Sequence, residues 1–549
     1  MALYILEKTA LANWCARYQH NFGHAGGNTH AASPSLLKFH LRKMPENTTL
    51  AATARPAISV RFVMTGLLLV ILLAAVEQTI VAVSLPAIAA ELHGMNLVAW
   101  VVAAYLIGAT VATPIYGKLS DIYGRKATMT SAISLFLLAS VACALAQTMP
   151  QLIAFRLLQG LGGGGLISVA QATIADVISL RERGKYQAYI SAVWLVASAG
   201  GPIAGGYLTQ HLSWHWIFWV NLPIGIVALI VMRSSLRHLS INPVKHSIDY
   251  IGAILFASGL SSVLIALTRI GQGAPVRDPR IIFLLTGGVL AVMVFIWHAR
   301  RISEPIIPLR MFQNRTVFIC CVAQFLGYFQ MLSMLVLIPL RLQMVSGVAP
   351  EIASLRLLPL TLAVPCGAFV AGRLMSVTGR YKPSQFGGAV AVTLAAAGLA
   401  FVDPERIAYM AVAMVILGLG IGLQFPTSMV ATQNAVPRSQ TGAATALASF
   451  SRMLGGAIGV SVLTSVLIAF LRNLMPPVAT GTVDVNTMLS TFHSIDFGTN
   501  GAVLRDAAEI AFRKVFVIGA AVSLISPLLI LRVPEHQLRG NAETAVPAE

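Results

Sequence analysis

Long apolar runs, separated by short polar stretches, recur along most of the chain. Each run is about twenty residues long, which is the length that a helix needs to cross roughly 30 Å of bilayer hydrocarbon. We expect about fourteen membrane-spanning helices, at residues 62–85, 98–117, 127–146, 151–172, 187–208, 215–233, 249–269, 281–299, 316–340, 352–374, 384–402, 407–428, 443–470 and 512–531. The pattern therefore predicts an all-α membrane protein.

The spacing of the glycines indicates that the chain repeats itself. Five glycines recur 258 positions later, namely Gly160, Gly162, Gly164, Gly184 and Gly201, as Gly418, Gly420, Gly422, Gly442 and Gly459. A shared offset predicts two pseudo-symmetric six-helix halves, related by an axis along the membrane normal. The two helices at 249–299 have no counterpart, so we interpret them as a pair inserted between the halves.

These features divide the chain into segments. We expect an N-terminal half at 62–233, an inserted linker at 249–299, a C-terminal half at 316–531 and a tail at 532–549. The C-terminal half contains a long polar outer loop at 471–511, whose last part (about 501–511) is expected to form a short helix.

Residues 1–43 show no helical periodicity and no signal-peptide core. We expect residues 1–61 to be a disordered extension, with Met44 as the natural start of the protein.

The composition indicates that the chain lies in a lipid bilayer, and the distribution of Lys and Arg predicts which loops face the cytoplasm. The chain is 56% hydrophobic and only 11% charged, and its formal net charge is +18. With both termini inside, the inner loops and the tail hold about nineteen Lys and Arg, against roughly ten outside, as the positive-inside rule requires. We therefore expect a multi-pass protein of the bacterial inner membrane with both termini in the cytoplasm. No basic helix or aromatic-basic platform suggests nucleic-acid binding.

Charged residues inside a span are costly and mark candidate functional sites. Glu77 lies about eight residues from the outer end of the first span and Arg156 about six residues from the outer end of the fourth, which places both about 10 Å deep. A carboxylate in a desolvated cavity can take a proton from one side and release it to the other. The alternative is a structural ion pair that holds the two helices together.

Two glycine-containing stretches suggest conformational roles. The loop GKLSDIYGRK places Asp121 among basic residues, where it can pair with Arg125 or with a facing helix end and latch one conformation shut. Its glycines, Gly117 and Gly124, allow close approach and unusual dihedral angles. In the fifth span, Gly201, Pro202, Gly205 and Gly206 belong to the stretch GGPIAGG, which either bends as a hinge or packs closely against a neighbouring helix.

Other polar residues in the spans are candidates to line a cavity, and they are Gln159, Gln324, Gln330, Gln424 and Arg452. For the glutamines of the second half, bonding to a neighbouring helix is the alternative. Arg452 could contact an anion or bond to another helix. Because neither Glu77 nor Arg156 has a charged counterpart in the repeat, we expect the ionisable chemistry to lie in the N-terminal half.

Six motifs together resemble the fourteen-helix drug:proton antiporter branch of the major facilitator superfamily, over about residues 60–540. They are VEQTIVAVSLP, WVVAAYLIGATVATPIYGKLSDIYGRK, FRLLQGLGGGG, GGPIAGG, WIFWVNLPIG and ASFSRMLGGAIG. The resemblance implies that the GKLSDIYGRK loop is the family's conformational motif and that GGPIAGG is its antiporter motif. It also implies that Arg156, Gln159 and Gly160 match the motif tied to proton transfer.

The chain departs from the family pattern at two positions. Glu77 stands where the family usually has Asp, so the carboxylate is kept but reaches one methylene further. His215 stands where Arg often precedes the WIF sequence, which leaves the loop between the fifth and sixth spans without a fixed charge.

Together these observations predict a proton-coupled exporter of small amphipathic compounds or drugs that works by alternating access, embedded in the bilayer and exchanging its substrate for protons. The alternatives are a dedicated exporter of an endogenous metabolite, antibiotic or siderophore, and a transport-dead sensor. No metal cluster, nucleophile with its base, or phosphate loop suggests an enzyme, a metal site, a cofactor or ATP-driven transport. No dimer face stands out, and such transporters can work as monomers.

Overall fold

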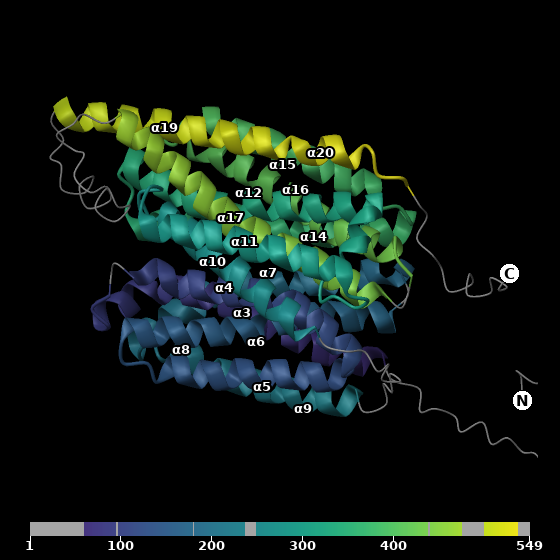
Figure 1. Ribbon diagram of the computed structural model, residues 1–549. Helices are drawn as coiled ribbons and strands as arrows, with labels where there is room; N and C mark the ends of the chain where they lie inside the picture. The colour runs from purple at the N-terminus through teal and green to yellow at the C-terminus, as the bar shows by residue number, and fades with distance from the viewer. Residues whose placement is uncertain are drawn as a thin grey trace, which may run out of the picture. The chain divides into compact units, whose positions relative to one another are not determined.

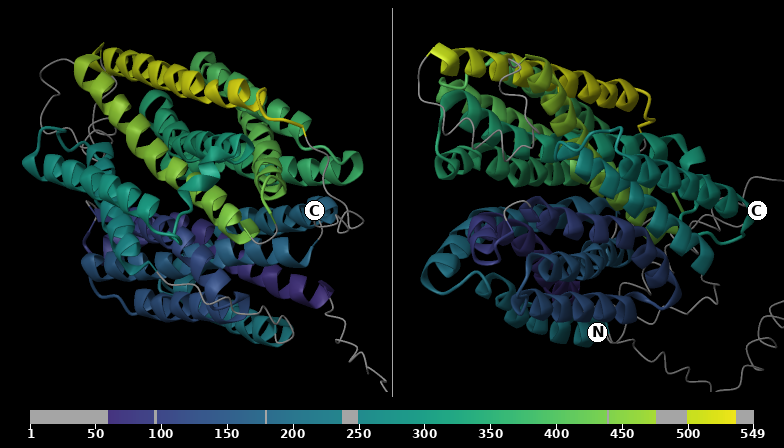
Figure 2. Two further views of the ribbon diagram at one scale, coloured as in Figure 1. Left: turned by 45° about the vertical axis from the view of Figure 1, so that its right-hand side comes forward. Right: turned by 60° about the vertical axis from the view of Figure 1, so that its left-hand side comes forward.

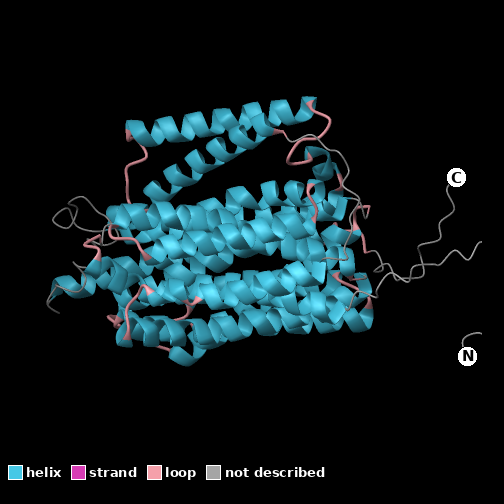
Figure 3. Cartoon of the chain, turned by 90° about the horizontal axis from the view of Figure 1, so that it is seen from below, coloured by secondary structure: helices cyan, strands magenta, loops and turns pink. Residues whose placement is uncertain are grey.

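The computed structural model describes residues 60–94, 97–178, 180–236, 249–437, 440–474 and 499–535. Within these ranges every regular element is a helix (Figure 3). Fourteen helical segments there are long and apolar enough to cross a membrane, so the predicted all-α architecture with about fourteen spans is confirmed. The expectations for the N-terminal extension and Met44, for most of the loop at 471–511 and for the tail beyond residue 535 lie outside the described residues.

The N-terminal half contains the first six spans. They are α3 (Val60–Glu91), α4 (Val98–Ile122), α5 (Arg125–Ala144), α6 (Met149–Val177), α7 (Leu180–His211) and a span divided into α8 (Trp216–Trp219) and α9 (Asn221–Ser235). Two further helices follow this half, α10 (Tyr250–Gly271) and α11 (Pro279–Arg301), and they pack against each other.

The C-terminal half contains the last six spans. After a short 3₁₀ helix, η3 (Leu309–Gln313), come α12 (Arg315–Ser346), α13 (Pro350–Leu355), α14 (Leu358–Thr378), α15 (Lys382–Phe401), α16 (Ile407–Asn434), α17 (Thr441–Leu474), α19 (Thr499–Ser523) and α20 (Ile525–Ile530). The helices of each half lie together, purple to blue for the first and green to yellow for the second (Figure 1), and two further views show the same grouping (Figure 2).

Local sequence sets several helix ends. Asn314 accepts hydrogen bonds from the backbone N–H groups of Thr316 and Val317, so it caps α12 at its start. Gly347, with φ of 63°, follows the last residue of the same helix in the left-handed conformation that glycine adopts without strain. Thr148 caps α6 in the same way as Asn314 caps α12, with a proline in the first turn. The ends of these two spans are therefore encoded locally.

The recurring glycines have matching packing roles in the two halves. A Cβ atom on Gly160 or Gly164 would meet backbone carbonyls of α4, and one on Gly418 or Gly422 would meet carbonyls of α14. The halves also share their helix pairs, since α6 packs on α4 and α5 as α16 packs on α14 and α15. The close approach of small residues therefore builds the core of each half in the same way.

The fifth span shows this close packing too. A Cβ on Gly201 or Gly205 would collide with α3 at Thr79 or Ile80, whereas one on Gly206 would only come into ordinary contact with Val83, at 4.0 Å. Helix α7 continues through Pro202 without interruption. Close packing thus accounts for two of the four motif residues, and the hinge role of the stretch stays a prediction.

The two halves contact each other at the end of the bundle that carries the α4–α5 and α6–α7 loops, which we call the basic end. Gly117 of α4 approaches Ala446 of α17, and Gly184 of α7 approaches α14 at Gly372. The Arg183 guanidinium of α7 donates to the Gln433 side chain of α16 over 2.8 Å. Small residues and one buried arginine therefore join the halves at this end.

An ion pair between a buried arginine and a partly exposed glutamate lies in the C-terminal half, where none was expected. Arg341 of α12 is 1% exposed and donates to both carboxylate oxygens of Glu509 on α19, over 3.0 and 2.5 Å. It also donates to the carbonyls of Leu399 and Val402. The expectation that the ionisable chemistry of transport lies in the N-terminal half stays a prediction. Arg341 lies one residue beyond the expected ninth span, and Glu509 lies in the expected short helix at 501–511, because both helices extend past the apolar runs.

We predict that Arg341→Met destabilises the folded protein by about 3 kcal/mol, because it leaves a carboxylate and two carbonyls without their donor. The matched control is Arg380→Met, since Arg380 is 61% exposed and lies 3.9 Å from Glu535. A pair of that kind contributes less than about 1 kcal/mol. Thermal unfolding of the two purified variants in detergent measures the difference. If both variants melt at the wild-type temperature, the pair of Arg341 and Glu509 does not stabilise the fold.

Candidate functional site

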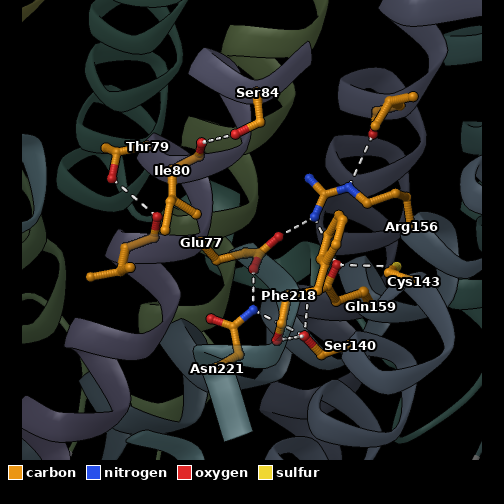
Figure 4. A network of polar contacts seen from close by, with 12 residues as sticks. Glu77, Thr79, Ile80, Ser84, Ser140, Cys143, Arg156, Gln159, Phe218 and Asn221 are labelled. Carbon is orange, nitrogen blue, oxygen red and sulfur yellow. Dashed lines mark hydrogen bonds and ion pairs between the residues drawn. The ribbon is translucent and has the colours of Figure 1, made fainter. Parts of the chain in front are cut away.

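The two charged residues singled out in the N-terminal half form an ion pair. Glu77 of α3 is 0% exposed and Arg156 of α6 is 2% exposed, and Nη1 of the arginine donates to Oε1 of the glutamate (Figure 4). Glu77 lies within the apolar run that the sequence assigned to the first span, and Arg156 within the fourth span. Each charge is thus withdrawn from water and compensated by the other.

The second oxygen of the glutamate has its own donor. Asn221, the first residue of α9, donates through Nδ2 to Oε2 of Glu77 over 2.5 Å and to Oγ of Ser140 over 2.9 Å. Ser140 of α5 donates in turn to the carbonyl of Phe218 over 3.0 Å. Because Phe218 belongs to α8, this chain of hydrogen bonds spans the break between α8 and α9 and ties it to the carboxylate (Figure 4).

The guanidinium has further partners. Arg156 donates through Nε to the carbonyl of Val101 over 3.2 Å and through Nη1 to Oε1 of Gln159 over 2.7 Å. Its Cζ atom lies 4.5 Å from the centre of the Tyr105 ring, so the charge also interacts with an aromatic face. Gln159 closes the network by donating to Ser140 over 3.3 Å.

This set of residues, which we call the Glu77 network, joins five elements of one half. Its members are Glu77, Tyr105, Ser140, Arg156, Gln159 and Asn221. We expected Gln159 to line a cavity, but it is 0% exposed and bonded on both sides. A buried polar network of this kind is sensitive to the loss of any one member, since a removed partner leaves a buried group unsatisfied. The arrangement can therefore relay a change at the carboxylate to several helices.

Asn221 and Ser140 were missed by sequence reasoning. Both are neutral polar residues in or beside an apolar run, where a hydroxyl or an amide does not interrupt the hydropathy signal. Asn221 does lie in the quoted WIFWVNLPIG motif, so its position in that motif was the one available signal.

A second cluster of charges lies at the basic end. Arg125, the first residue of α5, is 5% exposed and forms ion pairs with Asp121 over 2.8 Å and with Asp176 over 2.7 Å. Gly124, with φ of 83°, precedes it and turns the chain between α4 and α5. A Cβ atom on Gly442, at the start of α17, would collide with both Asp121 and Arg125. One residue of this cluster, Asp176 at the end of α6, was not predicted.

The glutamines of the C-terminal half bond to neighbouring helices. Gln324 of α12 donates to the carbonyl of Phe425 over 3.2 Å, and Gln424 of α16 donates to the carbonyl of Ala323 and to Ser526. Gln330 accepts a hydrogen bond from Ser523. All three glutamines are at most 1% exposed and bond to a neighbouring helix, while a role in lining a cavity stays a prediction.

Arg452 of α17 differs from the other arginines that lie deep within the spans. Its Cζ atom lies 5.8 Å from the centre of the Tyr328 ring and 5.7 Å from that of Phe425. Within the described part of the chain no group accepts a hydrogen bond from its buried Nε atom. Neither interhelical bonding nor an ion pair therefore explains this residue.

Comparison with known proteins identifies the architecture. The sequence profile of the Major Facilitator Superfamily matches residues 67–460. An uncharacterized MFS-type transporter of Mycobacterium tuberculosis is 32% identical over 488 residues, which are 88% of this chain and 71% of that protein. Multidrug resistance protein 3 of Bacillus subtilis is 32% identical over 462 residues, which are 83% of this chain and 86% of that protein.

A solved structure supports the fold. The crystal structure of the human organic anion transporter MFSD10 matches with a TM-score of 0.57 over 86% of this chain and 99% of that one, at 14% identity, which bears on the fold alone. The sequence relatives also confirm the resemblance to the multidrug-efflux branch. With its fourteen candidate spans and two six-helix halves, this chain belongs to the Major Facilitator Superfamily and is a multi-pass membrane transporter.

Proposed function

We propose that this transporter exports small amphipathic compounds in exchange for protons, and that Glu77 carries the proton. The observation that carries this proposal is the Glu77 network, in which a fully buried carboxylate has a single charged partner, Arg156. Relatives named for multidrug transport and multidrug resistance support the substrate class.

Protonation of Glu77 would change the balance of charge in the network. The neutral acid no longer compensates Arg156, and an uncompensated buried charge costs several kcal/mol. The arginine is then driven toward other acceptors or toward water, and its contacts with Val101 and Gln159 change with it. Because these contacts reach α4, α5 and α9 as well as α3 and α6, taking up a proton favours a different arrangement of the helices of this half.

The basic end supplies the second element of an alternating-access cycle. We propose that this end faces the cytoplasm, with both chain termini on that side, because Lys and Arg concentrate in its loops. The Arg125 cluster and the contacts of Gly117 and Gly184 with the C-terminal half then close the cytoplasmic side. Separation of the halves at these contacts would open it.

The bilayer that this orientation implies is a cytoplasmic membrane, which in a bacterium is the inner membrane. We propose that the transporter works as a monomer. No step in the proposed cycle requires a cofactor, because the energy source is the proton gradient.

We predict that Glu77→Gln abolishes gradient-driven transport, because glutamine keeps the shape of the side chain but cannot release a proton. The measurement is dye accumulation in proteoliposomes under an imposed pH gradient. Rhodamine 6G serves as the cationic probe and fluorescein as the anionic probe. Glu77→Asp keeps a carboxylate and should retain coupling at a reduced rate. Glu91→Gln is the matched control, since Glu91 lies at the exposed end of the same helix. Dye accumulation by Glu77→Gln at the wild-type level would show that the proton follows another path.

We further predict that Arg125→Gln weakens the closure of the basic end, because both Asp121 and Asp176 lose their partner. In a background without native cysteines, spin labels at Tyr123→Cys and Val377→Cys, two exposed positions at the basic end on opposite halves, report the separation of the halves. Arg125→Gln should shift the distance distribution toward longer distances, whereas Lys126→Gln removes the same charge from the next position and should leave it unchanged. Equal distributions in all three proteins would mean that the Arg125 cluster does not hold the halves together.

A further inference from the structure

Arg452 is a partly buried cation that has no counter-charge among the described residues. Its Nε atom is buried and has no acceptor, and within the described ranges its guanidinium contacts the faces of two aromatic rings, those of Tyr328 and Phe425. Cation–π contacts compensate only part of the cost of desolvating a charge. The residue thus lacks the strongest kind of partner that a guanidinium has, an anionic oxygen.

Two other arginines within the spans each have a carboxylate partner, in contrast to Arg452. Arg156 is paired with Glu77, and Arg341 donates to both oxygens of Glu509. Arg452 lies in the span Thr441–Leu474 and has no carboxylate partner among the described residues. Since the two pairs are each neutral, the charge of Arg452 is left over. An unpaired ionisable residue at such a position is a functional candidate.

The neighbours of Arg452 add a second unsatisfied group. Gln324 is 0% exposed and uses its amide N–H to reach the carbonyl of Phe425, which leaves its own buried oxygen without a donor in the described part of the chain. Gln324 and Tyr328 are one turn apart on α12, and both lie next to Phe425. One cationic donor and one neutral acceptor therefore lie around the same pair of aromatic rings.

These groups lie where the two halves meet. Met453, the residue after Arg452, belongs to an apolar cluster built from the N-terminal half that includes Tyr105. The ring of Tyr105 lies 4.5 Å from Cζ of Arg156. Gly456, one turn beyond Arg452, allows the Tyr328 ring to pack against α17, because a Cβ atom there would collide with the ring. The unpaired arginine is thus at the interface that alternating access opens and closes.

We propose that Arg452 binds the anionic group of an amphipathic aromatic substrate, whose rings pack on Tyr328 and Phe425 and whose polar hydrogen meets the free oxygen of Gln324. This proposal rests on the proposed export function and specifies its substrate class as carboxylates or sulfonates. Glu77 does not serve as a counter-ion for a cationic drug in this arrangement, because both of its oxygens already accept hydrogen bonds from Arg156 and Asn221.

Binding measurements on the purified full-length protein in detergent test this assignment without a proton gradient. Fluorescein and rhodamine 6G share a xanthene skeleton and carry opposite charges, so their fluorescence polarisation isolates the role of charge. We expect wild-type protein to bind fluorescein, and we expect Arg452→Gln to weaken that binding by about 10-fold or more, the range of a charge-assisted hydrogen bond. Arg452→Lys should retain part of the affinity, and rhodamine 6G binding should not fall in either variant.

Arg472→Gln is the matched control, because Arg472 lies near the end of the same helix and donates to the carbonyl of Gly273. It should bind fluorescein as the wild type does, which separates a specific effect from a general loss of structure. Equal fluorescein affinity in wild type and Arg452→Gln would overturn the proposal, and so would a wild-type protein that binds rhodamine 6G alone. Failure of the proposed export function has a different signature, namely charge-selective binding of fluorescein without transport under a pH gradient.

Discussion

The ion pair between Glu77 and Arg156 is the interaction on which the rest of the N-terminal half depends. Two opposite charges that are both almost completely buried can stay ionised only while they face each other and their remaining donors and acceptors are satisfied. Asn221, Gln159 and the carbonyl of Val101 supply those partners, each from a different part of the half. The positions of these helices are consequently tied to the charge state of one carboxylate.

Each half is packed tightly enough to move as a rigid body relative to the other half. Glycines bring α6 against α4 and α16 against α14 with no side chain between the backbones, so each half is a tightly packed unit. Between the halves, the contacts at the basic end include those of Gly117 and Gly184, the Arg183–Gln433 hydrogen bond and the packing of the Arg125 cluster against Gly442. Two rigid halves that meet along such an interface can separate as bodies, which is the motion that alternating access requires.

The spans and the central ion pair could be predicted from the sequence because their signals are strong. A run of about twenty apolar residues has the length of a membrane span, and a charge inside such a run is conspicuous, as Glu77 and Arg156 both were. The recurring glycines also revealed the two halves, since their packing roles repeat at one offset. Apolar runs, the charges within them and repeated glycines can all be read from the order of residues in one sequence.

The partners of Glu77 and the other polar contacts could not be predicted from the sequence, because they depend on which helices are neighbours in the fold. Ser140 and Asn221 are ordinary polar residues until the fold places them beside Glu77. Arg341 and Glu509 were placed just outside the expected spans, because hydropathy ends a span where the first charge occurs, whereas both helices continue past that charge. Arg452 was visible as a charge in a span, but only the structure shows that no carboxylate of the described residues faces it.

The central claim is that the proton on Glu77 sets the arrangement of the two halves. Spin labels at Tyr123→Cys and Val377→Cys, two exposed positions at the basic end on opposite halves, report that arrangement as a distance. The account predicts that acidification shifts the distance distribution in protein with Glu77 intact. It also predicts that Glu77→Gln holds the acidic distribution at every pH. A Glu77→Gln protein that retains the full pH-dependent shift would contradict the account, because another group would then control the change.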